Sequence, residues 1–146
     1  MTVVLDASAA AEIAKRSARG VDFVNMLLRS DMVMAPDIYI AEISNVMWKL
    51  WLMDKKNSGL YRTMAADCME YVDEYVAAAD IWREAVIEAQ THMHSVYDML
   101  YVVLAKRNDA KLLTSDLKLR GVCAKLGVRY YDGLAAELGA DRAVSI

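Results

Sequence analysis

The sequence has little of what marks a membrane, secreted or multidomain protein. A bilayer span needs about 20 consecutive apolar residues, and no run approaches that length although apolar residues make up 57% of the chain. No basic segment precedes the apolar start at Thr2, so we expect no signal peptide. Cys68 and Cys123 lack metal-ligand spacing and are typical of reduced core residues in a cytoplasmic protein.

An excess of basic charge is also lacking, since the formal net charge is −3. That balance gives no electrostatic footprint for tight nonspecific DNA binding. It leaves a nucleic-acid enzyme possible, because carboxylates that bind a metal lower the net charge. The single proline gives no linker, so residues 1–146 are expected to form one domain, with a short tail that includes Leu134, Leu138 and Val144.

Short apolar segments alternate with helical patterns along the chain. The expected strands are Thr2–Leu5, Met32–Ala35, Lys111–Thr114 and Val128–Tyr131. The expected helices begin at Asp6 and then cover Gly20–Arg29, Asp37–Lys55 (opened by Pro36), Leu60–Val76, Ile81–Gln90, Ser95–Lys106 and Leu117–Leu126. Strands separated by helices predict an α/β fold of three layers, α/β/α, around a mainly parallel sheet of four to five strands.

The segment Ser95–Lys106 predicts a buried helix that carries a carboxylate. At helical spacing Asp98 shares a stripe with Tyr101, Val102 and Ala105. A buried carboxylate needs a partner, because a bare one costs several kcal/mol or more. A structural alternative is a capping box, with Ser95 as the N-cap and Asp98 at the third helical position.

Three further acids are expected near the same place. Asp6 and Asp116 stand where strands give way to helices, and such points share one edge of a parallel sheet. Glu42 projects from the long helix that follows another strand. Each has a simpler interpretation, since Asp6 could be only an N-cap and Glu42 could belong to a solvated stripe with Asn45 and Lys49.

Four neighbouring carboxylates repel one another unless one is protonated or a cation lies between them. An all-oxygen site favours Mg²⁺ or Mn²⁺, which commonly joins carboxylates to a substrate phosphate. The implied chemistry is metal-assisted hydrolysis of a phosphodiester. His92 and His94 give only a weak metal signal and are interpreted as a loop, although His94 could tune Asp98.

Four segments together resemble the PIN-domain family, and within it the VapC ribonuclease toxins of VapBC toxin–antitoxin pairs. They are Leu5–Ser8, Pro36 with Ala41–Val46, Ser95–Ala105, and Leu112–Asp116. The resemblance implies a Mg²⁺- or Mn²⁺-dependent endoribonuclease whose catalytic and metal-binding residues are Asp6, Glu42, Asp98 and Asp116. It assigns supporting roles to Ser8, Asn45 and Thr114. Many relatives carry a further acid where this chain has Lys118, which puts a fifth ligand in doubt.

The resemblance also implies partners. These are an RNA substrate, a VapB-like antitoxin and a second copy in a homodimer, for which the apolar surface Val46–Met53 and the stripe of Tyr61, Met64 and Cys68 are suited. Four basic residues are candidate phosphate contacts: Arg16, Arg19, Lys118 and Arg120. Arg120 lies four residues after Asp116, so a salt bridge is an equal or better interpretation.

Two rival functions stay open at this point. One is a PIN nuclease that processes RNA without a toxin role. The other is a non-catalytic module that keeps the fold and binds a partner. Phosphotransferases of the haloacid-dehalogenase type are disfavoured, because they need a second Asp where this chain has Ser8.

Overall fold

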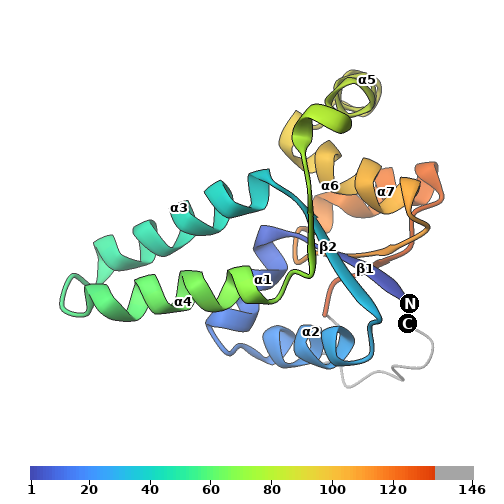
Figure 1. The fold of residues 1–146 in the computed structure, drawn as a ribbon. Coiled ribbons are helices and arrows are strands. Elements are labelled where there is room, and N and C mark those ends of the chain that lie inside the picture. The colour runs from blue at the N-terminus through green and yellow to red at the C-terminus, as the bar shows by residue number, and fades with distance from the viewer. Residues whose placement is uncertain (134–146) are drawn as a thin grey trace.

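The computed structural model describes residues 1–133, and the tail that follows lies outside the described residues. Five parallel strands alternate with helices (Figure 1). The strands are β1 (Thr2–Leu5), β2 (Met32–Pro36), β3 (Glu74–Val76), β4 (Lys111–Leu113) and β5 (Tyr130–Tyr131). The α-helices are α1 (Ala7–Ala14), α2 (Ala18–Leu28), α3 (Ile38–Met53), α4 (Ser58–Glu70), α5 (Trp82–His92), α6 (Val96–Arg107) and α7 (Arg120–Leu126), with 3₁₀ turns at Ala78–Asp80 and Leu117–Leu119.

The sheet order is β3-β2-β1-β4-β5, so β1 lies in the centre. The register pairs Leu5 of β1 with Leu113 of β4. The residues that follow these two strands therefore emerge side by side at one edge. The predicted α/β fold with a parallel sheet is confirmed, with all five strands parallel.

Helices cover both faces of the sheet. Right-handed connections place α1–α4 on one face and α5–α7 on the other, and Figure 1 shows these groups on opposite sides of the strands. The helix α6 crosses behind β1, β2 and β4, and its residues Met99–Ala105 are all buried. The prediction that Ser95–Lys106 forms a buried helix is thus confirmed.

The sequence prediction missed β3, because it continued the preceding helix to Val76. The structure ends α4 at Glu70 and pairs Glu74–Val76 with β2. Tyr71 and Tyr75 continued the helical stripe, but residues four apart share a face in a strand as well as in a helix. Asp73 favours the strand, because its carboxylate and amide both bind the backbone of Val33 at 2.8 Å.

Two other element boundaries were predicted wrongly. Pro36 closes β2 instead of opening the next helix, which begins after Asp37. The segment after Asp116 begins as a 3₁₀ turn, and α7 starts only at Arg120. This second difference matters below, because side chains four residues apart do not align over a 3₁₀ turn as they do over an α-helix.

The helices α3 and α4 run side by side and project from the sheet as an arm (Figure 1). A cavity of about 450 Å³ lies between them, lined by residues that include Met47, Trp48, Trp51, Tyr61 and Arg62. The arm exposes large apolar side chains, among them Trp48 (53%) and Met53 (85%). Within residues 1–133, no helix is long and apolar enough to span a bilayer.

Candidate active site

Asp6 follows the central strand and is almost fully buried, with 6% of its surface exposed. It is the N-cap of α1, and its Oδ1 accepts bonds from the Ser8 hydroxyl at 2.6 Å and the Ala9 amide at 2.9 Å. Burial raises the pKa of Asp6 to about 6, and the charge of Glu42 adds to the rise. The bonds from Ser8, Thr114 and Ala9 act in the opposite direction. The N-cap interpretation is therefore right, but capping of α1 does not explain why a second acid, Glu42, lies near Asp6.

Ser8 and Thr114 connect the loops that follow β1 and β4. The Ser8 hydroxyl accepts a bond from the Ser115 amide at 3.0 Å and lies 3.3 Å from the Thr114 hydroxyl. The Thr114 oxygen accepts the Asp116 amide at 3.0 Å. The Ser8 and Thr114 hydroxyls also both bond to the Asp6 carboxylate and lower its pKa. Two predicted supporting residues thus tie the backbone beside Asp116 to Asp6.

Asp98 lies in the first turn of α6, where the Ser95 hydroxyl caps the helix by accepting the Asp98 amide at 3.2 Å. The predicted N-cap is therefore present. Burial raises the pKa of Asp98, and the charge of Asp116 raises it further. The hydroxyl of Ser95 and the charges of His94 and Lys118 lower it. His94 follows the end of α5, as the loop interpretation expected, but His92 is the last residue of that helix and pairs with Glu88, so the loop interpretation is wrong for His92.

Glu42 projects from α3 and is bound by a side chain that the sequence analysis did not assign to the site. The Tyr101 hydroxyl donates to Glu42 Oε1 at 2.6 Å. Burial raises the pKa of Glu42, the bond from Tyr101 lowers it, and the charge of Asp98 raises it. The sequence analysis places Tyr101 in the Asp98 stripe and in the segment Ser95–Ala105, and these two signals could have assigned it to the site.

The structure brings the four predicted acids into one electrostatic group. The charge of Glu42 raises the pKa of Asp6, the charge of Asp98 raises that of Glu42, and the charge of Asp116 raises that of Asp98. Among residues 1–133, no salt bridge pairs any of these four with a Lys or Arg. Carboxylates that raise one another's pKa values and have no Lys or Arg partner favour a cation between them.

An ion of the Mg²⁺ type fits this set of ligands, although the described part of the chain contains no group of three or more side chains already placed to hold a metal. The ligands are all carboxylates, which Mg²⁺ and Mn²⁺ prefer. Mg²⁺ usually keeps several waters and binds through only one or two carboxylates. A loosely arranged acid cluster is compatible with that mode of binding.

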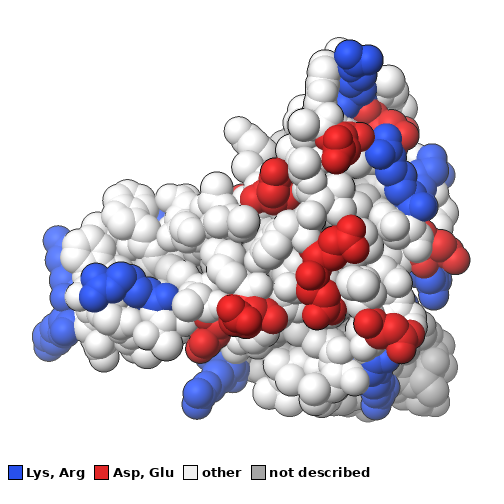
Figure 2. All heavy atoms as spheres, viewed as in Figure 1, with Lys and Arg blue, Asp and Glu red and all other residues white. Residues whose placement is uncertain are grey.

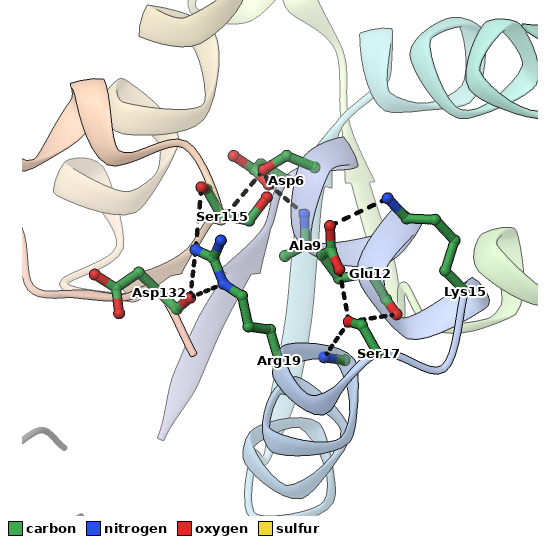
Figure 3. A network of polar contacts seen from close by, with 10 residues as sticks. Asp6, Ala9, Glu12, Lys15, Ser17, Arg19, Ser115 and Asp132 are labelled. Carbon is green, nitrogen blue, oxygen red and sulfur yellow. Dashed lines mark hydrogen bonds and ion pairs between the residues drawn. The ribbon is translucent and has the colours of Figure 1, made fainter. Parts of the chain in front are cut away.

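Arg19 fastens the loops that carry the site. Its guanidinium donates to the backbone oxygen of Ser115 at 3.1 Å and to that of Asp132 at 2.8 and 2.9 Å. Figure 3 shows Arg19 reaching from α2 toward the loops after β4 and β5, beside Asp6. Arg19 thus makes a structural link to the residue before Asp116, and its phosphate contact stays a prediction.

For Arg120 the alternative of a salt bridge to Asp116 is wrong, and the phosphate contacts of Arg16 and Arg120 stay predictions. Arg120 pairs with the Asp132 carboxylate and not with Asp116, because the intervening 3₁₀ turn breaks the helical spacing and Asp116 instead accepts the Lys118 amide at 3.0 Å. Arg16 follows the C-terminal end of α1, whereas Asp6 caps the other end, about 12 Å away at 1.5 Å per residue. Lys118, another of the four basic candidates, lowers the pKa of Asp98 through its charge.

Asn45 is the predicted supporting residue that the structure does not connect to the acids. It is exposed on α3, one turn after Glu42. Its side chain forms no hydrogen bond to any other residue of the range 1–133. Its role stays a prediction.

Comparison with known proteins gives four similarities. The family model described as the PIN domain matches residues 3–125. "Ribonuclease VapC3" of Pyrobaculum aerophilum is 29% identical over 126 residues, which cover 82% of this chain and 92% of the relative.

Among solved structures, that of PAE2754 from Pyrobaculum aerophilum aligns with a TM-score of 0.67 at 19% identity, covering 97% of this chain and 100% of that one. The structure of VapBC2 from Rickettsia felis, bound to a promoter DNA fragment, aligns with a TM-score of 0.64 at 14% identity, covering 89% and 97%. These two likenesses support the fold. With the family model matching most of the chain, the protein belongs to the PIN domain family.

Proposed function

We propose that this chain is a Mg²⁺- or Mn²⁺-dependent endoribonuclease and the toxin of a type II VapBC toxin–antitoxin pair, acting in the cytoplasm. The observation that carries the proposal is the group of four acids from separate segments, three of which have raised pKa values and none of which has a Lys or Arg salt-bridge partner in residues 1–133. PIN family membership and the likeness to "Ribonuclease VapC3" support it.

In the proposed reaction, water hydrolyses a phosphodiester of RNA. The water oxygen forms a bond to phosphorus, the bond from phosphorus to a ribose oxygen breaks, and that oxygen leaves with a proton. A bound divalent ion supplies positive charge that stabilises the reacting phosphate and lowers the pKa of water. Asp6, Glu42, Asp98 and Asp116 would hold the ion, while Ser8 orients Asp6 through the 2.6 Å bond.

A cleavage assay on transfer and ribosomal RNA tests this proposal. We expect cleavage with Mg²⁺ or Mn²⁺ and none with EDTA. Asp6→Asn and Asp98→Asn should abolish the metal-dependent cleavage while leaving the circular dichroism spectrum unchanged, and the exposed acid variant Asp67→Asn should cleave like the parent. Cleavage by both site variants at the parent rate would contradict the assignment.

The rival functions give different outcomes in the same experiments. A processing nuclease would cleave RNA without arresting growth when expressed alone. A binding module would leave RNA intact at every ion concentration.

The arm formed by α3 and α4 is the proposed contact for a VapB-like antitoxin. It combines the cavity of about 450 Å³ with exposed Trp48, Leu52 and Met53. The Trp51 indole N–H is buried and has no hydrogen-bond partner among the described residues, so it remains a donor for a bound segment. An apolar helix face in such a groove is a common mode of recognition. The sequence predicts Cys68 as part of this surface, but Cys68 is fully buried and cannot contact a partner there.

This partner is tested by co-purifying the chain with the protein encoded by a neighbouring short reading frame. We expect Trp48→Glu to weaken capture of that partner at least tenfold and to leave RNA cleavage unchanged. Trp82→Glu is the matched control, since Trp82 on α5 is similarly exposed at 48%. Equal capture by both variants would show that the arm is not the contact.

A homodimer is also proposed, and it is tested by sedimentation of the chain alone.

A further inference from the structure

A buried tyrosine of one helix contacts one of the four acids on another helix. Tyr101 on α6 is 3% exposed, and its hydroxyl donates to Oε1 of Glu42 on α3, 59 residues away in sequence, at 2.6 Å. The bond joins a helix beneath the sheet to the helix that becomes the arm. At this length it is a strong hydrogen bond to a carboxylate.

The phenol is held as a neutral donor. Burial raises the pKa of Tyr101, and the charges of Glu42 and Asp6 raise it further. Tyr101 therefore gives its single proton to Oε1 and cannot compete as a second anion. Within residues 1–133, no other side chain donates to either Glu42 oxygen, so Oε2 is left for a ligand.

We propose that Tyr101 is a positioning residue that holds the Glu42 carboxylate in the orientation needed to receive a divalent ion. The inference rests on the proposed function. A half-buried glutamate on a projecting helix loses rotamer freedom when it binds an ion. A hydrogen bond to one of its oxygens restricts the rotamers already in the folded protein, so that less conformational entropy is lost when the ion binds. Outer partners that orient a ligand in this way typically change metal affinity about 10- to 100-fold.

The chain contains a matched control for loss of a buried hydroxyl. Tyr39 on α3 is 0% exposed, and its hydroxyl also donates over 2.6 Å, but to the backbone oxygen of Cys68. Substitution of either tyrosine by Phe keeps the ring and removes one buried hydrogen bond. Only the Tyr101 variant removes a hydrogen bond to a proposed ion ligand.

The experiment measures Mn²⁺ binding by isothermal titration calorimetry without RNA, together with the Mn²⁺ dependence of RNA cleavage. We expect Tyr101→Phe to weaken Mn²⁺ binding about tenfold and to raise the Mn²⁺ concentration needed for half-maximal cleavage by a similar factor. The cleavage rate at saturating Mn²⁺ should change much less. Tyr39→Phe should bind Mn²⁺ like the parent.

A double-mutant cycle separates positioning from general packing. If Tyr101 acts through Glu42, then Tyr101→Phe should have little further effect on Mn²⁺ binding in a Glu42→Gln background. An undiminished effect there would overturn the inference. If Tyr101→Phe does not fold, Tyr101→Leu takes its place, because it also removes the hydroxyl, leaves Glu42 intact and should also weaken Mn²⁺ binding.

The remaining outcomes are distinct. Equal Mn²⁺ binding by Tyr101→Phe and the parent, or equal weakening by Tyr101→Phe and Tyr39→Phe, overturns the positioning role and leaves the nuclease proposal standing. A parent protein that neither binds Mn²⁺ nor cleaves RNA overturns the proposed function, and the role of Tyr101 falls with it.

Discussion

At the scale of single residues, burial of the Asp6 carboxylate lowers the stability of the metal-free fold. Its pKa is raised from 3.8 to about 6, mainly by burial. As the pH rises from about 4, the unfolded chain loses this proton first, so the free energy of unfolding falls until about pH 6 and stays lower above it. One pKa unit corresponds to about 1.4 kcal/mol, so the ionised side chain destabilises the metal-free fold by roughly 3 kcal/mol at most.

We therefore predict that Asp6→Asn stabilises the metal-free protein at pH 8. The amide can still accept the bonds from Ser8 and Ala9 and carries no charge to bury, so the free energy of unfolding should rise by about 1–3 kcal/mol. Urea denaturation in EDTA measures the change. At pH 4 the difference between variant and parent should nearly vanish, because the parent carboxyl is then protonated. A difference independent of pH would contradict the raised pKa.

At the scale of elements, α2 joins the parts of the chain that carry the acids. Arg19 at its start binds the loops after β4 and β5. Gly20 lets the helix approach α1, because a Cβ atom there would lie 2.1 Å from the Glu12 carbonyl oxygen. The polar network around Arg19, Ser17 and Glu12 is visible in Figure 3.

Replacement of Arg19 should loosen the loop before Asp116. We expect Arg19→Ala to lower the free energy of unfolding by about 1–3 kcal/mol, since the loop carbonyls lose a charged donor. Arg19→Lys should recover only part of this loss, because an ammonium group cannot bridge two backbone oxygens as the planar guanidinium does. Thermal melts measure both, and Arg29→Ala on the exposed end of α2 should melt like the parent. Full recovery by Lys would contradict the proposed geometry.

The packing of α1 against α2 gives a second prediction at this scale. Gly20→Ala should destabilise the fold by about 2 kcal/mol or more, because backbone atoms of α1 must move. Gly121→Ala in α7 is the control, since nothing lies within 4 Å of its added Cβ. The control should be neutral or stabilising by up to about 1 kcal/mol, as expected for Ala in a helix. Similar melting temperatures for the two variants would show that α1 and α2 are less closely packed.

At the scale of the whole molecule, acidic residues outnumber basic ones. The net charge is −3, and on the face shown in Figure 2 acidic side chains gather over the centre while basic ones lie toward the edges. No broad basic surface appears on that face. A divalent ion among the acids would therefore provide much of the positive charge that an RNA phosphate meets.

Binding of such an ion should stabilise the entire fold, because its ligands come from four distant segments. At an Mn²⁺ concentration 100 times the dissociation constant, the gain is about 2.7 kcal/mol. We expect the melting temperature to rise with Mn²⁺ and return to its starting value with EDTA. Asp98→Asn and Asp116→Asn should lose most of the rise and Asp67→Asn none of it. An equal rise in all variants would indicate nonspecific binding.

Much of the fold and of the site follows from local sequence. Apolar strands followed by acids predicted the central sheet and the positions of Asp6 and Asp116, and Ser95 predicted the start of α6. These features depend on nearest neighbours along the chain, as strand patterns and helix caps do. They were enough to indicate the family that the comparisons then established.

The tertiary structure alone decided which side chains meet. The bond from Tyr101 to Glu42, the Arg19 link to Asp132 over 113 residues, and the pairing of β3 with β2 all join distant segments. Such contacts depend on how helices cross the sheet and on strand register, which a local pattern does not encode. The sequence by itself thus determined which residue types stand at the ends of the strands, and packing determined how each acid is held, because orientation depends on neighbours brought together only by folding.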